Sequence, residues 1–261
     1  DSNLPLFNVA SYNVGSMQAG SVSKHSHYHT HISNIRSLLA THQIVHILET
    51  RFAKEDQHTL QLEFPNHHIF YNNLSSRSAG TATLVGSTIA RELAIEHHIV
   101  DPGYTAYIHL TPLPGSKYTA CARYFAIYLA TGNSARNRKR TEQTLSNADD
   151  THPNSNDTPR PHDDDQPSDE PDDTPTTYTD DIWKIRERQI KQLKRLERQD
   201  LSIYSGDWNF VFSPEDTQHP KTTSYYRIPS SFQKTWDKFA EKHELTEIPQ
   251  NLHTRYQFNT K

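Results

Sequence analysis

The chain has 261 residues, a formal net charge of -4 and a mean hydropathy of -0.86. Its single cysteine, Cys121, excludes an internal disulfide and a cysteine-rich zinc module. No segment approaches the roughly 20 apolar residues of a membrane-spanning helix. The N-terminus has neither a secretory signal pattern nor an initiator methionine. These features predict an intracellular protein that is not integral to a membrane, and a chain that is part of a longer one.

Acidic residues are concentrated in one segment, Ser146 to Asp181. It holds 12 acidic residues and one basic residue, with six prolines and one aromatic side chain. Such a segment cannot bury enough apolar surface to offset the entropy of ordering it, which predicts a disordered insertion. The rest of the chain has 26 basic and 19 acidic residues, a balance that suits a partner with a phosphate backbone. We expect one domain, formed by residues 1–145 and 182–261.

Residues before the insertion predict strands and one helix. The helix covers His31 to Leu39, where aliphatic residues recur on one face. The strands are apolar or alternating runs bounded by polar, glycine or proline turns. They cover Leu6 to Val14, Ile44 to Leu48, His68 to Asn72, Thr81 to Val85, Ala94 to Val100, Ala106 to Thr111 and Tyr118 to Leu129. The order begins β-α-β and continues as an antiparallel meander.

Residues after the insertion predict a basic amphipathic helix from Ile182 to Asp200, a strand from Leu201 to Ser205 and a helix from Ser230 to His243. Strands flanked by helices in this order predict an α/β (α+β) fold. Two mainly antiparallel sheets would pack face to face, with the helices outside.

Polar side chains follow four of the apolar runs, in the stretches SYNVGS, ILET, IYLATG and SGDWNF. Sites in layered α/β proteins commonly lie at the carboxyl ends of buried strands. We therefore expect the polar residues of these stretches to form one site. They are Asn13, Glu49, Tyr128, Asp207 and Asn209.

The residue types at this site favour a hard metal ion. On an extended chain Asp207 and Asn209 point to the same face while Trp208 turns into the core. Glu49 offers a carboxylate oxygen without a neighbouring His or Cys pair, which favours Mg²⁺ or Mn²⁺ over zinc. A metal that offsets phosphate charge, with a carboxylate that activates water, can hydrolyse a phosphodiester. The alternative left open is that Glu49 caps a strand end and Gly-Asp-Trp-Asn is only a turn.

The order of the four motifs resembles the endonuclease/exonuclease/phosphatase superfamily, whose deoxyribonuclease-like fold is a four-layer α/β/β/α sandwich. More narrowly, GDWNFVFSPEDTQ is similar to the endonuclease domain of non-LTR (LINE-type) retrotransposons. The resemblance runs from about Phe7 to Thr254, interrupted by the acidic insertion. Its specificity lies in the order and spacing of all four motifs together.

The resemblance implies Mg²⁺- or Mn²⁺-dependent nicking of DNA and a role for each site residue. Glu49 matches the metal-binding Glu, and Asn13 matches the Asn that organises the metal and phosphate. Tyr128 matches a Tyr that contacts the scissile phosphate. Asp207 matches the residue that activates or orients the attacking water, and Asn209 the residue that stabilises the transition state. Whether one or two metals act stays open.

The chain departs from the family pattern at two places. Leu129, Ala130 and Thr131 follow Tyr128, where the family usually has a Pro two residues on, so the loop conformation stays open. The family's Arg-Leu-Asp strand and Ser-Asp-His motif do not appear before Lys261. From the resemblance we expect the chain to lack the catalytic His, its Asp partner and part of the second sheet. We also expect it to have little or no nuclease activity by itself.

Clustered cations are candidate DNA contacts. The run Arg136, Arg138, Lys139 and Arg140 follows Tyr128 closely and is expected to contact phosphates that flank the cut; it equally fits a nuclear-localisation signal. The basic helix after the insertion is a second candidate, but a charged outer face is the default for an amphipathic helix. The acidic insertion is either a solvated connection or a mimic of DNA that covers the basic cleft.

The stretch HSHYHTH, His25 to His31, places four histidines at alternate positions. They would share a face only in an extended strand, so we interpret the stretch as a solvated loop that leads into the first helix.

The function that we predict is therefore a metal-dependent DNA endonuclease domain of a retrotransposon-like protein, with a nuclear location if that origin holds. Two alternatives stay open. One is a truncated, inactive remnant that at most binds nucleic acid; the other is a phosphatase or phosphodiesterase of the same superfamily. The pattern gives no oligomeric state.

Overall fold

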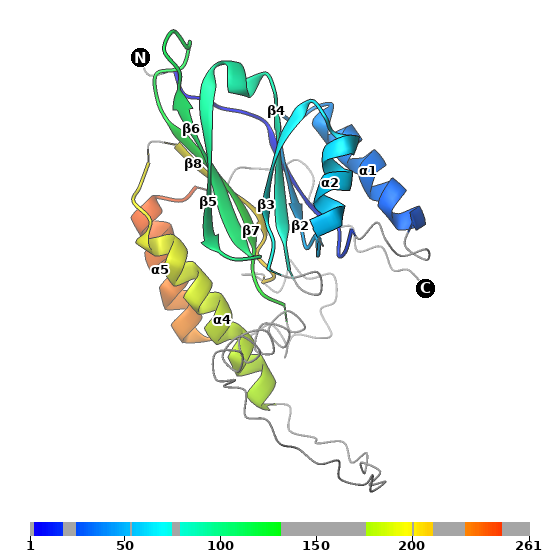
Figure 1. Cartoon of the computed structure of the whole chain (residues 1–261). Helices are drawn as coiled ribbons and strands as arrows, with labels where there is room; N and C mark the ends of the chain where they lie inside the picture. The colour runs from blue at the N-terminus through cyan, green and yellow to red at the C-terminus, as the bar shows by residue number, and fades with distance from the viewer. Residues whose placement is uncertain are drawn as a thin grey trace, which may run out of the picture.

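The computed structural model describes residues 3–17, 25–52, 54–74, 79–131, 176–199, 201–210 and 228–246 (Figure 1). Its elements in chain order are β1 (Val9–Asn13), α1 (His25–Leu39), β2 (Ile44–Leu48), α2 (Lys54–Glu63), β3 (His67–Asn72), β4 (Thr81–Gly86), the 3-10 helix η2 (Ile89–Arg91), β5 (Leu93–Asp101), β6 (Thr105–Pro112), β7 (Ala122–Tyr128), α4 (Thr176–Arg195), β8 (Leu201–Asp207) and α5 (Ser230–His243).

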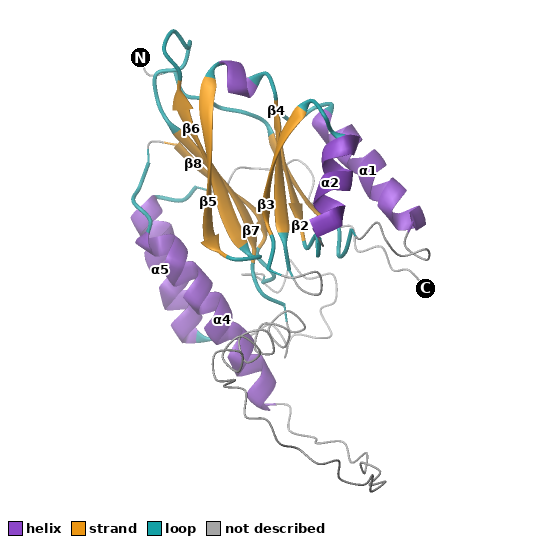
Figure 2. Cartoon of the chain, in the orientation of Figure 1, coloured by secondary structure: helices purple, strands orange, loops and turns teal. Residues whose placement is uncertain are grey.

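The described strands form two four-stranded sheets (Figure 2). The strand order is β1-β2-β4-β3 in the first sheet and β5-β6-β7-β8 in the second. Strand β1 runs parallel to β2, and β7 runs parallel to β8, whereas the other neighbours are antiparallel. Each parallel pair therefore brings two carboxyl ends to the same edge of its sheet.

The sandwich has four layers, and four apolar clusters fill the spaces between them. Helices α1 and α2 cover the outer face of the first sheet, and α4 and α5 cover the outer face of the second (Figure 1). Two further clusters fill the space between the sheets. The structure thus confirms the predicted fold class, an α/β/β/α sandwich of two sheets with outer helices.

Strand β2 shows how the sequence specifies these layers. All five of its residues are buried, because the strand lies between a helix layer and the other sheet. Val45 and Ile47 belong to the cluster under α1 and α2, whereas Ile44 and Leu48 belong to the clusters between the sheets. His46 shares the inner face, where its Nδ1 forms a 2.9 Å hydrogen bond with Thr83 Oγ1.

Several predicted elements differ from the structure. Helix α2 was not predicted, because its sequence KEDQHTLQLE is mostly polar and buries few apolar side chains. Helix α1 begins at His25 rather than His31, so the HSHYHTH stretch is helical and not a loop. Buried Tyr28 anchors this added turn in the core. Helix α4 begins at Thr176, inside the predicted insertion, and ends at Arg195 rather than Asp200. Residues 146–175 lie outside the described residues.

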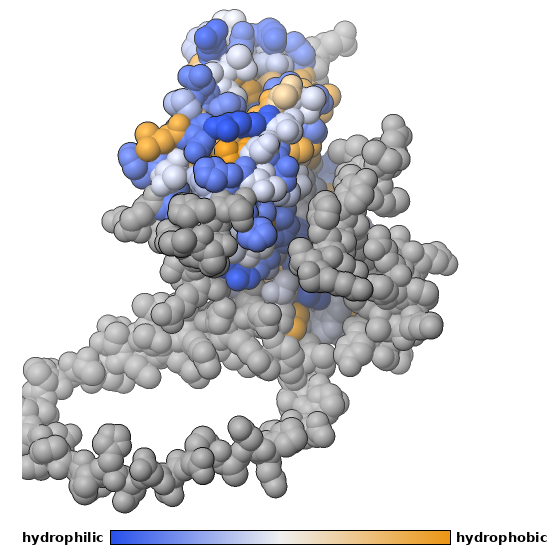
Figure 3. Space-filling model, turned by 90° about the vertical axis from the view of Figure 1, so that its right-hand side faces the viewer, coloured by the Kyte–Doolittle hydropathy of each residue, from blue (hydrophilic) through white to orange (hydrophobic). Residues whose placement is uncertain are grey.

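The outer face of the first helix layer is mainly hydrophilic where Figure 3 shows it in colour, with scattered apolar side chains. Single exposed apolar residues of this kind are normal on a protein surface. Within the described ranges, no helix is both long enough and apolar enough to cross a bilayer.

Candidate active site

Four strand ends meet at one edge of the sandwich. Asn13 closes β1 and pairs with Leu48, the last residue of β2, so Glu49 follows next to Asn13. Tyr128 closes β7 and pairs with Asp207, the last residue of β8. A hydrogen bond joins the two sheets at this edge, since Asn13 Nδ2 donates to Asp207 Oδ2 over 3.0 Å. The structure therefore brings residues that are 194 positions apart into contact.

Hydrogen bonds fix the Asp207 carboxylate from both sides. Its Oδ2 accepts from Asn13, and its Oδ1 accepts from the backbone N–H of Asn209 over 3.0 Å. The backbone carbonyl of Asp207 accepts from the Leu129 N–H over 2.9 Å, which ties β8 to the end of β7. A carboxylate held in this way has few orientations left, so it is preorganised to act on a ligand at the edge.

Gly206 allows the close approach of β8 to β7 just before Asp207. Its φ is +147°, and a Cβ atom at this position would lie 1.9 Å from the carbonyl oxygen of Ile127. A side chain here would force the strands apart and shift Asp207. The glycine is therefore part of the geometry that places the carboxylate.

Asn209 lies at the site, but its backbone is not extended as the sequence predicted. Its φ is +52°, so the chain turns after Asp207 and does not stay extended. The turn lets Asn209 Nδ2 donate to the Leu129 carbonyl over 2.6 Å. Trp208 points to the helix layer, where its ring packs edge-on against Trp236 with centroids 5.0 Å apart.

Glu49 lies in a constrained loop after β2. Glu49 and Arg51 both have positive φ, +60° and +52°. The backbone N–H groups of Thr50 and Arg51 donate to the carbonyls of Gly80 and Ala79 over 3.0 and 2.9 Å, which hold the loop in place. The Glu49 side chain is only 14% exposed and forms an ion pair with Arg51. Non-glycine residues with positive φ carry strain, and such strain is typical of functional sites.

Tyr128 is fully buried between the sheets, where its ring stacks on Tyr104 at 6.1 Å between centroids. Its backbone N–H donates to the Tyr104 carbonyl over 2.9 Å. In this conformation the side chain supports the site from within and is not open to a ligand from solvent. The predicted contact between Tyr128 and phosphate would require it to become exposed.

Arg186 is a site residue that sequence reasoning missed. It projects from α4, and its Nε donates to the Ala130 carbonyl over 2.9 Å while its guanidinium lies 4.8 Å from the Trp183 ring centre. Burial lowers its pKa to about 10, whereas the charges of Asp207 and Tyr128 oppose this shift. The group therefore stays cationic at neutral pH next to Asp207. The available signal was its spacing, because positions 186, 190 and 193 share one helix face, of which Ile190 and Leu193 are core residues.

A buried polar network supports the same edge from behind. Gln189 accepts a hydrogen bond from the Ala130 N–H and donates to Asp101 Oδ2, both over 3.1 Å. Asn72 donates to the Asp101 carbonyl over 3.1 Å and accepts from the Gly103 N–H over 2.8 Å. Because these partners come from α4 and from both sheets, the network locks the ends of the layers together.

Ion pairs occupy part of the positive charge of α4 and of the residues just after it. Lys191 pairs with Glu187 over 2.6 Å, and Arg198, just after the helix, pairs with Glu244 of the α5 end. These contacts favour a structural role for the helix face. The candidate phosphate contacts Arg136, Arg138, Lys139 and Arg140 lie outside the described residues.

The donor set at the edge suits a hard divalent cation. Glu49 and Asp207 offer carboxylate oxygens, and no cysteine or histidine stands among the five predicted residues. The mostly buried Glu49 carboxylate already needs a positive partner, which Arg51 provides in this structure. Mg²⁺ or Mn²⁺ bound by Glu49, beside Asn13, would meet that need in place of Arg51.

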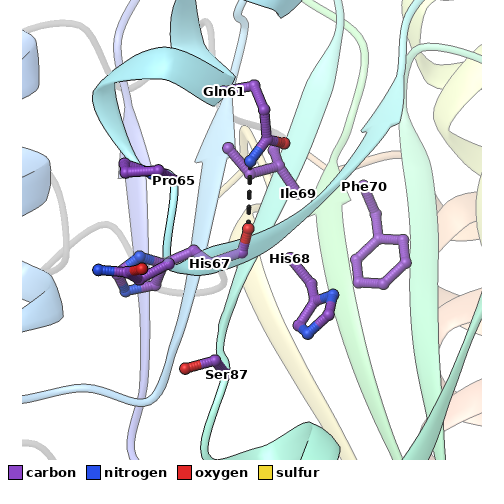
Figure 4. Close-up of a pocket in the computed structure, with 8 residues that line it drawn as sticks. Gln61, Pro65, His67, His68, Ile69, Phe70 and Ser87 are labelled. Atoms are coloured by element: carbon purple, nitrogen blue, oxygen red, sulfur yellow. Dashed lines mark hydrogen bonds between the residues drawn. The ribbon is translucent and has the colours of Figure 1, made fainter.

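A surface hollow lies at the opposite end of the first sheet. It measures about 510 Å³ and is formed by the end of α2 and the start of β3 (Figure 4). Gln61 Nε2 donates to the His67 carbonyl across it over 3.4 Å. His67 pairs with Gly86, whereas Asn72 and Thr81 mark the site end of the same strands. The hollow is therefore separate from the strand-end site.

Comparisons with known proteins found similar solved structures but no sequence family. No family model and no curated protein matches the chain. An AP endonuclease from Archaeoglobus fulgidus is 13% identical, with a TM-score of 0.48, over 90% of this chain and 70% of that one. The AP endonuclease LMAP from Leishmania major is 11% identical, with a TM-score of 0.48, over 89% and 65%. A hairpin-deletion mutant of beta toxin from Staphylococcus aureus is 11% identical, with a TM-score of 0.46, over 92% and 73%.

Proposed function

We propose that the chain is a metal-dependent phosphodiesterase domain that nicks DNA. The observation that carries the proposal is the meeting of Asn13 and Asp207 across the two sheets, where Leu48, the strand partner of Asn13, directly precedes Glu49. Two carboxylates and an amide at one edge are a suitable set for binding a metal, holding a phosphate and activating water. The basic balance of the chain outside residues 146–181 favours a nucleic acid as the source of that phosphate.

Each residue has a distinct task in this proposal. Glu49 holds Mg²⁺ or Mn²⁺, which when bound offsets charge on the phosphate and on the leaving oxygen. Asp207, oriented by Asn13 and Asn209, accepts a proton from the attacking water. Arg186 places a positive charge near Asp207 and helps to hold the site in position. The similarity of GDWNFVFSPEDTQ to LINE-type endonucleases supports a retrotransposon origin, and with it a nuclear location.

The test is nicking of supercoiled plasmid with the enzyme in excess, since the resemblance predicts low activity for this chain alone. We expect slow nicking that requires Mg²⁺ or Mn²⁺ and that falls by about 100-fold or more in Asp207→Asn, because a general base contributes 10²–10⁴-fold. Asp237→Asn is the matched control, as Asp237 is an exposed carboxylate on α5 that accepts only a local 2.8 Å bond from Gln233. DNA binding without metal-dependent nicking, or equal nicking by Asp207→Asn, would contradict the proposal.

A further inference from the structure

Three metal-binding side chains converge on the outer face of the second sheet. Glu96 on β5 and His109 on β6 lie directly opposite each other, and His98 is two residues from Glu96 on the same face. One ligand atom from each of the three lies within 4.8 Å of the others. His98 also stacks on Tyr107, with ring centroids 4.8 Å apart, which limits its rotation.

The imidazole nitrogens of this group lack partners within the described part of the chain. The Nε2 atoms of His98 and His109 are both shielded from solvent, and neither has a hydrogen bond there. His98 Nε2 lies 3.4 Å from Glu96 Oε2, a contact that becomes an ion pair only if the histidine is protonated. A shielded lone pair without a donor costs free energy, and a metal ion would use these lone pairs.

The surroundings of His109 favour its neutral form. Burial lowers the pKa of His109, and the charge of Arg123 on β7 lowers it further, while Glu96 opposes both. The Arg123 guanidinium contacts other groups. It lies 5.2 Å from the Tyr107 ring centre and donates to the Glu197 carbonyl over 2.7 Å. Neutral imidazole is the form that binds metals.

The cluster is distinct from the strand-end site. His109 pairs with Arg123, which precedes Tyr128 by five residues along β7, a separation of roughly 16 Å at the usual rise of a strand. The cluster and the Tyr128 side chain also lie on opposite faces of the second sheet. Tyr128 belongs to the layer between the sheets, whereas Tyr107, on the face of His98 and His109, belongs to the cluster under α4 and α5.

We propose that Glu96, His98 and His109 bind a zinc ion that links β5 and β6. Two imidazole nitrogens and one carboxylate form a common three-ligand zinc set, which leaves a fourth position for water or a partner's ligand. Small side-chain rotations bring the donors from within 4.8 Å to about 3.3 Å, the spacing around a tetrahedral zinc ion. The ligand types differ from the oxygen donors of Glu49 and Asn13, so the two sites select different metals.

The test is titration of the chain with Zn²⁺ alone by calorimetry, and with Co²⁺ by its visible absorption, which reports tetrahedral nitrogen and oxygen ligation. Glu96→Gln is the main variant, because Glu96 is exposed and its amide should leave the fold intact. His98→Gln is the second variant. His68→Gln is the control, since His68 is an exposed histidine on β3 of the other sheet.

We expect one Zn²⁺ site in the parent and in His68→Gln, a tetrahedral Co²⁺ spectrum, and a rise in melting temperature with Zn²⁺. Loss of one ligand should weaken binding by about tenfold or more and abolish the spectrum. Zinc affinity and spectrum that are unchanged in both Glu96→Gln and His98→Gln would overturn the proposal, as would the absence of a zinc site in the parent. Neither result would affect plasmid nicking, so this test is independent of the proposed function.

Discussion

Arg186 is the residue whose role the structure changes most. The sequence predicts a solvated side chain, because Arg186 belongs to a basic helix. In the structure it turns inward and donates a hydrogen bond to the Ala130 carbonyl. It lies close enough to Asp207 for the charge of Asp207 to raise its pKa. Arg186 therefore acts through Asp207 as a positioning residue.

We predict that Arg186→Gln lowers the nicking rate at saturating metal by about tenfold or more, because the hydrogen bond to the Ala130 carbonyl and a positive charge near Asp207 are both lost. Arg186→Lys should recover part of the rate, because it restores the charge without the fork of donors. Arg188→Gln is the control, as Arg188 is exposed on the same helix. If Arg186→Gln lowered stability but left the nicking rate unchanged, Arg186 would be only a structural residue.

Residue types and strand ends predicted which side chains come together at the site, but not their local backbone conformation, burial or direction. Asn13, Glu49 and Asp207 follow apolar runs whose lengths mark the strand ends, so their meeting at one edge could be anticipated. The left-handed turn at Asn209, the burial of Tyr128 and the inward direction of Arg186 could not. Each depends on contacts with segments that are distant in sequence.

At the scale of elements, the parallel pairing of β7 and β8 is the feature on which the site depends most. Gly206 lies against the backbone of Ile127, and a Cβ atom there would be 1.9 Å from its carbonyl oxygen. The contact is with backbone, so no side-chain rotation can relieve it. A side chain at position 206 would therefore force β7 and β8 apart, which would move Asp207.

We predict that Gly206→Ala lowers the free energy of unfolding by about 3 kcal/mol or more, from the forced backbone shift and the unfavourable φ together. Gly115→Ala is the matched control, because Gly115 also has positive φ, +81°, but a Cβ atom there would have no neighbour within 4 Å. The control should cost only about 1 kcal/mol. Urea unfolding measures both, and equal losses would show that close approach at Gly206 is unimportant.

The bounds of β2 and α5 were predicted to the residue, whereas those of α1, α2 and α4 were not. The bounds of β2 and α5 agree with the sequence, since β2 is buried on both faces and α5 has Phe232 and Phe239 seven residues apart on its core side. Helix α2 buries Leu60 in a mostly polar segment, which gives no such pattern. The start of α1 was missed because histidines dilute its apolar face, although Tyr28 anchors it.

At the scale of the whole molecule, His46 makes stability depend on pH. It lies between the two sheets, fully buried, and burial lowers its pKa from 6.5 to about 3. In the unfolded chain His46 therefore binds a proton below about pH 6.5, whereas in the folded chain it binds one only below about pH 3. Stability from this group is complete above the unfolded pKa and is lost as the pH falls through that window.

We predict that acidification below about pH 6.5 lowers the free energy of unfolding, with His46 contributing about 1.4 kcal/mol per pH unit. Other histidines whose pKa burial lowers, such as His97 and His243, act in the same direction. His46→Gln should therefore reduce the slope by that amount. Parallel slopes in the parent and His46→Gln would refute the assignment.

The central claim is that Glu49 binds the divalent metal that supports DNA cleavage. The most direct measurement is the plasmid nicking rate as a function of Mg²⁺ concentration, in the parent, in Glu49→Gln and in Glu63→Gln. Glu63 is the matched control, because it forms an ion pair with Arg36 over 2.5 Å, away from the strand ends. We predict that only Glu49→Gln raises the half-saturating Mg²⁺ concentration, by about tenfold or more, and lowers the maximal rate. The same Mg²⁺ dependence in all three proteins would contradict the claim.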